Sequence, residues 1–96
     1  AEARAKTGAQ LILADPYVIE ADRNDAFRSM MDRYCDCVHR LAVEFGAVSV
    51  RVQDAFDEAL RSRPSDYWAR DRVHPYSYGH AVIALAFLRA AGFEIQ

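Results

Sequence analysis

The feature that most constrains the fold is a continuous apolar run at residues 10–14 (Gln-Leu-Ile-Leu-Ala), closed by Asp15-Pro16. Strands that are buried on both faces read as such runs, and they belong to parallel sheets covered by helices. Ligands of open α/β sheets bind beyond the carboxyl ends of the strands. We therefore predict an α/β chain in which Tyr17, just after this strand, lies near a binding site.

A long amphipathic helix and a second strand are expected next. The helix is predicted over residues 24–45, capped by Asp22 or Asn24 and ended by Gly46. Its apolar side chains recur every three or four residues, so one face should turn to a core, the two methionines included. These positions are Phe27, Met30, Met31, Tyr34, Cys35, Val38, Leu41, Ala42 and Phe45. Residues 47–52 should form the second strand, completing a strand-helix-strand unit with parallel strands.

The C-terminal part is predicted to hold a short helix over 53–62, a loop over 65–76 and a last helix over 78–91 capped by Ser77. In the last helix, Phe87 is expected to face inward with its apolar neighbours. Gly92 should end this helix, with Phe93 folding back onto it.

Two parallel strands are too few for a stable sheet, since about three or more strands or helix cover are needed. Residues 1–7 are good helix formers, and Gly8 stands where a helix would end. We therefore expect other strands to come from a missing N-terminal segment or from a second copy of the chain.

Composition indicates an ordinary globular chain. The 96 residues are 52% hydrophobic and 27% charged, enough for one domain, and the net charge of −2 favours neither a nucleic-acid nor an anionic-membrane partner. No apolar run approaches the roughly 20 residues needed to span a bilayer. The cysteines, Cys35 and Cys37, are expected to be reduced thiols, which favours a cytoplasmic setting. A secreted parent protein stays open, because a signal peptide further upstream would leave no trace here.

The residues with the most specific chemistry are Asp71-Arg72-Val73-His74-Pro75, followed by Gly79-His80 and an apolar helix. Asp71 can accept a hydrogen bond from the His74 ring and fix its tautomer. The other ring nitrogen can then take a proton from a nucleophile. Pro75 is expected to hold the loop extended before the helix, and Gly79 to permit close helix packing. His80 is expected to be a packing or capping residue.

This block resembles the C-terminal block of the SGNH (GDSL-type) hydrolases, in which Asp-x-x-His-Pro precedes the last helix. The resemblance implies a flavodoxin-like three-layer α/β/α fold with parallel strands and a serine esterase mechanism without a cofactor. It assigns the catalytic roles of orienting carboxylate to Asp71 and of base to His74. Residues 1–96 would then be a single-domain fragment, the C-terminal half of such a domain.

The family's other blocks are missing from this sequence. It has neither a Gly-Asp-Ser nor a Gly-x-Asn-Asp block, and none of its five serines lies in a nucleophile motif. The resemblance therefore places the serine nucleophile and the oxyanion hole outside this chain. We expect the 96-residue chain to be inactive by itself.

The resemblance extends to the carbohydrate acetyl-esterase branch of the family. It is carried by Ala14 to Tyr17, by Met31 to Tyr34 and by the Asp71 block. It implies short acyl esters, with acetylated sugars preferred and lipid or thioester substrates left open. Candidate substrate contacts are Trp68, Arg72 and Tyr17. For Trp68 and Tyr17 the alternative is simple packing, and for Arg72 it is an exposed, solvated side chain.

Two other functions stay open at this point. A truncated α/β half could be a non-catalytic interaction or self-assembly domain, because it would expose strand edges. A metal-binding module could use Cys35, Cys37, His39 and His80. The helix geometry argues against it, since Cys35 and His39 share a face while Cys37 points nearly opposite. No spacing matches a zinc motif, and we assign no metal ligands.

Overall fold

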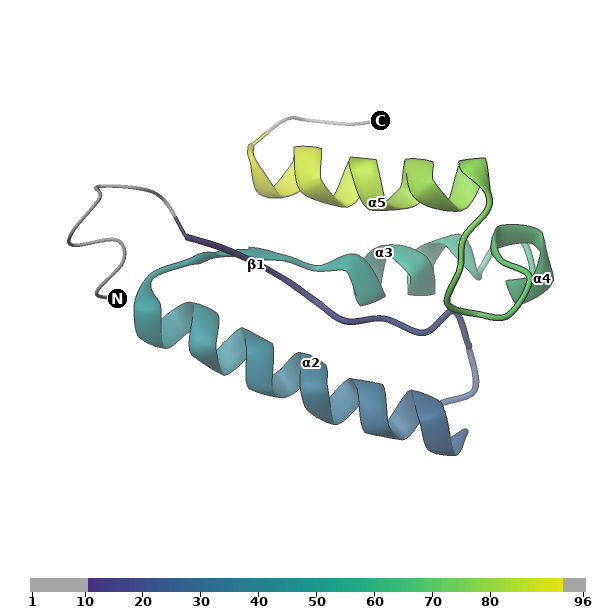
Figure 1. Cartoon of the computed structure of the whole chain (residues 1–96), viewed down its shortest axis with the longest axis horizontal. Helices are drawn as coiled ribbons and strands as arrows, with labels where there is room; N and C mark the ends of the chain where they lie inside the picture. The colour runs from purple at the N-terminus through teal and green to yellow at the C-terminus, as the bar shows by residue number, and fades with distance from the viewer. Residues whose placement is uncertain (1–10, 93–96) are drawn as a thin grey trace.

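Residues 11–92 are described by a computed structural model, in which two short parallel strands lie between helices (Figure 1). Strand β1 spans Ile12–Ala14 and strand β2 spans Val48–Val50, paired in the register Ile12↔Val48 to Ala14↔Val50. Helix α2, Ala26–Phe45, connects the two strands. Because parallel strands cannot be joined by a tight turn, this long crossover follows from their direction.

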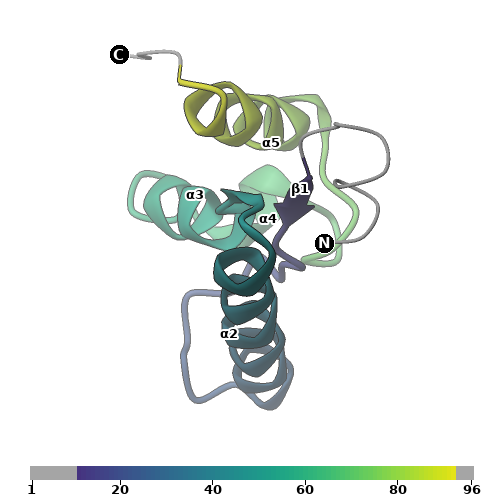
Figure 2. The same ribbon diagram turned by 90° about the vertical axis from the view of Figure 1, so that its left-hand side faces the viewer.

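The strands have helices on both sides. Figure 2 shows α2 on one side of them and α5, Ser77–Ala90, on the other. Helix α3, Val52–Ala59, follows β2 directly and packs against α5. A single-turn helix, α4, spans Ser65–Trp68 and leads into the loop before α5. This arrangement of parallel strands between helices confirms the predicted α/β fold class.

The core lies where β2, α3 and α5 meet. Its buried members come from all three elements and from the segments after β1 and α4. They are Ile19, Val50, Val52, Phe56, Ala69 and Ala86. Phe56 is fully buried, and its ring lies 4.9 Å from that of Tyr17, measured between centroids. The residues that follow β1 are therefore packed onto α3. These same residues support the Asp71 loop.

Helix α2 begins later than predicted and has a different cap. Asp25 is its N-cap, and the side-chain oxygen Oδ2 accepts a hydrogen bond from the Arg28 amide at 3.0 Å. Asp22 is not the cap, because its side chain accepts from the Asn24 amide within the preceding turn. The predicted end is confirmed: Gly46 adopts a left-handed conformation with φ 63°, which glycine reaches without steric cost.

The apolar face of α2 is only partly buried. Cys35 and Ala42 are buried, but Met30 is 36% exposed and Tyr34 is 54% exposed. Leu41 and Phe45 are exposed as well. The prediction that the whole face, both methionines included, packs into a core is therefore wrong for this part of the molecule. A sheet of two three-residue strands is too small to cover a 20-residue helix.

The first strand is also less covered than predicted. Ile12 is 55% exposed and Ala14 is exposed, although the apolar run had indicated burial on both faces. β1 pairs with β2 on one side only among the residues described. A strand with one neighbour cannot bury both of its faces and both of its edges.

Several boundaries differ from the prediction by a few residues. β2 ends at Val50, and the next buried valine, Val52, already begins α3. The predicted loop contains α4, which Pro64 precedes and which we did not predict. α5 begins at Ser77 itself, so Tyr76 is its N-cap and Ser77 is not.

Three further expectations concern the ends of the molecule. Phe87 in α5 is 43% exposed rather than facing inward. The upstream helix over residues 1–7 with Gly8, and the folding back of Phe93, lie outside the described residues. Across residues 11–92, no helix combines the length and the apolar character that crossing a membrane would require.

Candidate active site

Asp71 and His74 lie in the loop between α4 and α5 and contact each other directly. The Asp71 atom Oδ2 is 2.5 Å from Nδ1 of the His74 ring. The other oxygen, Oδ1, accepts hydrogen bonds from the amides of Val73 at 3.1 Å and His74 at 2.8 Å. A carboxylate that bonds backbone amides two and three residues on forms a tight local turn. This turn holds the imidazole against the carboxylate.

The hydrogen bonds to Asp71 favour its ionised form. The His74 ring, followed by the amides of His74 and Val73, lowers the pKa of the Asp71 carboxyl below its ordinary value. A carboxylate at Nδ1 selects the tautomer that carries its proton there, which leaves Nε2 as the basic nitrogen. The His74 side chain is 83% exposed, so Nε2 is accessible from solvent. The pair is therefore an oriented base with an open approach.

The loop is tied to the segment that follows β1. The Ile19 amide donates to the Arg72 carbonyl at 2.8 Å, and the Tyr17 hydroxyl donates to the Val73 carbonyl at 3.2 Å. The Arg72 guanidinium contacts Glu20 at 2.8 Å. These bonds position the Asp71–His74 turn at the carboxyl end of β1, where ligands of α/β folds bind.

Arg72 differs from its predicted exposed state. Its side chain is 34% exposed, and it contacts two carboxylates, Glu20 and Asp25. It also lies over the Phe27 ring, 5.6 Å from the guanidinium carbon to the ring centroid. The sequence could not show this, because Glu20 and Asp25 lie about fifty residues away along the chain.

Gly79 and Trp68 hold the other side of the loop. A Cβ atom added at Gly79 would lie 2.6 Å from the Pro75 Cβ and 2.7 Å from the Trp68 carbonyl oxygen. The predicted close packing at Gly79 is thus confirmed. Trp68 is partly buried and donates from Nε1 to the Arg63 carbonyl at 3.1 Å. His80 is exposed, so its predicted packing role is wrong.

Sequence reasoning missed Arg28, the largest fully buried side chain described. Its guanidinium binds both oxygens of Asp57 at 2.7 and 2.8 Å, Asp32 at 2.8 Å and the Glu20 carbonyl at 2.6 Å. Asp57 on α3 is therefore paired with the buried Arg28. One signal was available: Arg28 precedes the two buried residues Cys35 and Ala42 at a regular seven-residue spacing.

The residues of the alternative metal site are not brought together. Cys35 is buried and Cys37 is exposed, on opposite sides of α2 as expected. Burial raises the pKa of the Cys35 thiol to about 12, and its Sγ donates to the Pro16 carbonyl. His39 binds Asp15 at 2.6 Å. Within residues 11–92, no three His, Cys, Asp or Glu side chains are arranged to hold a metal ion.

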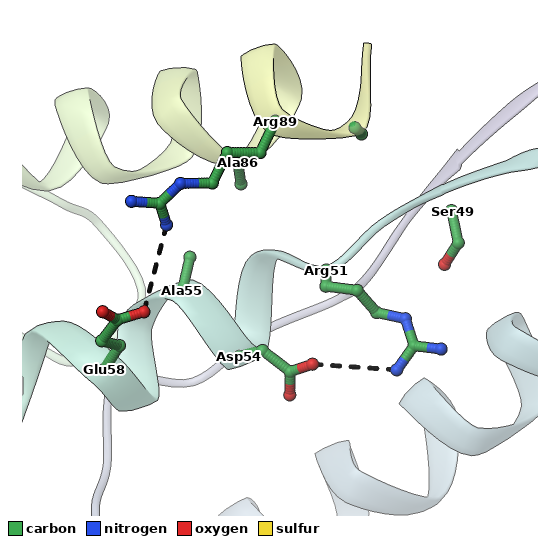
Figure 3. A pocket seen from close by; sticks show the side chains of 8 residues that line it. Ser49, Arg51, Asp54, Ala55, Glu58, Ala86 and Arg89 are labelled. Carbon is green, nitrogen blue, oxygen red and sulfur yellow. Dashed lines mark ion pairs between the residues drawn. The ribbon is translucent and has the colours of Figure 1, made fainter. Parts of the chain in front are cut away.

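A cavity of about 280 Å³ lies between α3 and α5, away from the Asp71 loop. Figure 3 shows two ion pairs at its rim, Arg89–Glu58 at 4.0 Å and Arg51–Asp54 at 3.7 Å. Both pairs are solvent-exposed, and exposed pairs of this length contribute little to stability. None of the predicted site residues lines this cavity, so it is separate from the candidate active site.

Known proteins similar to this chain are esterases and hydrolases. An acetylxylan esterase of Geobacillus stearothermophilus is 42% identical over 84 residues, which are 88% of this chain and 38% of the relative. The solved structure of LAE5, an alpha/beta hydrolase enzyme from the metagenome of Lake Arreo, Spain, superposes with a TM-score of 0.88 at 45% identity. That match covers 95% of this chain and 43% of LAE5.

The acetylxylan esterase Axe2 from Geobacillus stearothermophilus also superposes with a TM-score of 0.88, at 38% identity, over 97% of this chain and 44% of Axe2. Three further Axe2 structures are catalytic mutants in which a serine, an aspartate or a histidine is replaced by alanine. No family model matches the chain. The chain spans less than half the length of each of these relatives.

Proposed function

We propose that this chain, whose Asp71–His74 block resembles that of the SGNH hydrolases, forms the C-terminal half of a serine esterase that cleaves carboxylic esters. His74 is the general base and then the general acid, and Asp71 is the carboxylate that orients it. The serine nucleophile and the oxyanion-hole donors lie on a part of the parent protein outside this chain.

The Asp71–His74 contact carries this proposal. The carboxylate lies 2.5 Å from Nδ1, and the opposite ring nitrogen is accessible. The aspartate and histidine replaced in the Axe2 catalytic mutants are three positions apart, the same spacing as Asp71 and His74. The serine replaced in Axe2 lies near the start of that chain, far from the other two. A serine at that place in the parent protein would fall outside the present chain.

The proposed reaction proceeds in two proton-coupled steps. Nε2 of His74 takes the serine hydroxyl proton while the serine oxygen attacks the ester carbonyl carbon. The bond to the alcohol oxygen then breaks, and His74 returns the proton to that oxygen. Water attacks the acyl-serine in the same way, releasing the acid. Asp71 stabilises the imidazolium that forms in each step.

We further propose small acyl esters as the substrates, with acetylated sugars preferred, on the basis of the similarity to acetylxylan esterases. Of the candidate substrate contacts, Tyr17 and Arg72 already use their polar atoms to hold the Asp71 loop. Trp68 also uses its Nε1, on the Arg63 carbonyl, but its ring is a candidate for stacking against a sugar, and we keep it as the proposed contact. The partly buried Trp68 lies beside the exposed Tyr67 and Tyr78, whose rings are 4.6 Å apart by centroid.

The test is a chimera in which this chain replaces the matching segment of the Geobacillus stearothermophilus acetylxylan esterase. We expect the chimera to hydrolyse p-nitrophenyl acetate and His74→Ala to reduce kcat by about 1,000-fold or more, since the histidine is the base. Asp71→Asn should reduce kcat by a similar order, because an amide stabilises the wrong tautomer.

The matched control is His80→Ala, which removes an exposed histidine six residues from His74. Its activity should stay within about twofold of the unmodified chimera. The 96-residue chain by itself should be inert and should not react with a serine-directed phosphonate. Full activity of the His74→Ala chimera would refute the proposal.

The parent protein must also complete the sheet. Exposed apolar side chains lie on β1 and on the outer face of α2, as Ile12, Tyr34 and Leu41 illustrate. We propose that the part carrying the nucleophile covers them and pairs with the free edge of β1. A second copy of the chain is the alternative occupant.

A further inference from the structure

The backbone of the Asp71–His74 turn contains a strained residue. Arg72 has φ 74°, in the left-handed region that residues with a Cβ atom adopt at an energetic cost. Among residues 11–92 it is the only residue other than glycine with positive φ. Such a conformation persists only when surrounding contacts hold it, and it occurs often at functional sites.

Two carboxylates hold the Arg72 side chain. Its Nη1 atom lies 2.8 Å from Glu20 and 3.2 Å from Asp25. Together these contacts raise the pKa of Arg72, with Glu20 the largest cause. Asp25 has a second role as the N-cap of α2, and the Glu20 carboxylate makes the shorter contact with Arg72 while its other oxygen accepts from the Asp22 amide.

The backbone of Glu20 is itself held in place by hydrogen bonds. Its carbonyl accepts from the buried guanidinium of Arg28 at 2.6 Å, and Arg28 is fixed by Asp57 on α3. Gln53 on the same helix bonds both the amide and the carbonyl of Val18. The strand-to-helix segment that carries Glu20 is therefore attached to two helices before it reaches Arg72.

We propose that Glu20 is a positioning residue for the Asp71–His74 pair, acting through Arg72. The ion pair holds the left-handed backbone between the two catalytic side chains, and thereby sets the distance from the carboxylate to the imidazole. This inference rests on the proposed function of Asp71 and His74. It assigns Arg72 to the support of the catalytic loop and not to substrate binding.

The first test uses the chimera described above. Glu20→Gln removes the charge but retains an oxygen that can accept from the Asp22 amide, as Glu20 does. We expect kcat to fall about 10-fold with KM within twofold, because small displacements of catalytic groups reduce rate more than binding. Glu44→Gln, an exposed glutamate on α2, is the matched control and should leave both constants unchanged.

A double-mutant cycle separates positioning from general loss of structure. If Glu20 acts through Arg72, then Glu20→Gln should have no further effect on kcat in an Arg72→Gln background. Additive losses would show that Glu20 acts by another route. A rise in KM with unchanged kcat in the Arg72→Gln variant would show instead that Arg72 contacts substrate. Either result would overturn the inference.

The second test does not depend on activity. The Asp71 carboxyl can be titrated by NMR in the 96-residue chain, where the His74 ring and two amides lower its pKa. Glu20→Gln should raise the pKa of Asp71 toward its ordinary value of 3.8, because a loosened turn weakens these bonds. Glu44→Gln should leave the titration unchanged.

The outcomes distinguish the two proposals. If His74→Ala leaves the chimera fully active but Glu20→Gln still raises the pKa of Asp71, the esterase function is refuted and the positioning effect is retained. If His74→Ala abolishes activity but Glu20→Gln changes neither kcat nor the pKa of Asp71, the esterase function is retained and the positioning role is refuted.

Discussion

Asp71 illustrates how much of the site is local. All three hydrogen bonds that reach its carboxylate come from within the next three residues. A tetrapeptide can therefore bring acid and imidazole within reach of each other. The exact distance between them and the direction in which the imidazole points also involve the Tyr17, Ile19 and Glu20 contacts from another part of the chain.

The lowered pKa of Asp71 predicts a pH dependence of stability. A carboxyl whose pKa is lower in the folded than in the unfolded state stabilises the fold above its ordinary value, here 3.8, and loses this contribution as pH falls toward the folded pKa. The stability difference between the chain and its Asp71→Asn variant should therefore be constant at neutral pH and shrink below about pH 4. Urea unfolding between about pH 7 and pH 2.5 measures it; a difference that does not change with pH would contradict the prediction.

Gly79 predicts a steric effect of a single methyl group. In Gly79→Ala the new Cβ would meet the Pro75 Cβ at 2.6 Å and the Trp68 carbonyl oxygen at 2.7 Å. The gain in helix propensity is at most about 1 kcal/mol, whereas overpacking against backbone costs about 1–3 kcal/mol. We expect a net loss of about 1–2 kcal/mol in the free energy of unfolding, read from urea midpoints. Ala81→Ser, an exposed change on the same helix, is the control; equal stability of the two variants would refute the clash.

At the scale of elements, α2 has two different faces. The buried positions Arg28, Cys35 and Ala42 are spaced by seven residues and face β1, β2 and α3. The exposed apolar positions, with Tyr34 and Leu41 among them, lie on another side of the helix. A hydrophobic periodicity identified the helix but could not say which apolar face is covered, because that depends on the elements beside it.

Arg28 is predicted to stabilise the junction of α2 and α3. Its side chain is 1% exposed and contacts Asp57 and Asp32. Arg28→Met keeps the length of the side chain but removes its hydrogen bonds to the partly exposed Asp57 and Asp32 carboxylates, and we expect a loss of about 1.5–3 kcal/mol in the free energy of unfolding. Arg33→Met, an exposed arginine on the same helix, should change the free energy of unfolding by less than about 0.5 kcal/mol. Similar unfolding midpoints for both variants would show that Arg28 contributes no net stability.

At the scale of the molecule, large apolar side chains are exposed on β1 and α2. Ile12, Tyr34 and Val43 are 55%, 54% and 84% exposed, although large apolar side chains in a whole domain are mostly covered. The relatives superpose well on this chain while extending to more than twice its length. We propose that the remaining part of a domain like theirs covers both β1 and α2.

Complementation tests this account. Adding the N-terminal segment of the Geobacillus stearothermophilus esterase to the 96-residue chain should reduce binding of a hydrophobic dye and slow amide exchange along β1. A matched chain with Ile12→Lys should bind the segment more weakly, because a charge would be buried at the sheet. If the chain forms dimers at micromolar concentration and ignores the added segment, a second copy is the partner instead.

The sequence by itself determined the fold class, the order of the main elements and the contact within Asp-x-x-His. These depend on local chain properties: hydrophobic period, helix ends, and hydrogen bonds between residues three positions apart. The positive φ of Arg72, its ion pair with Glu20 and the burial of Arg28 were decided only by the tertiary structure. The Arg72–Glu20 pair joins residues 52 positions apart, and Arg28 contacts Glu20 and Asp57, which are eight and 29 positions away. Such long-range pairings arise from the packing of α2, α3 and the β1 segment, to which no local pattern is sensitive.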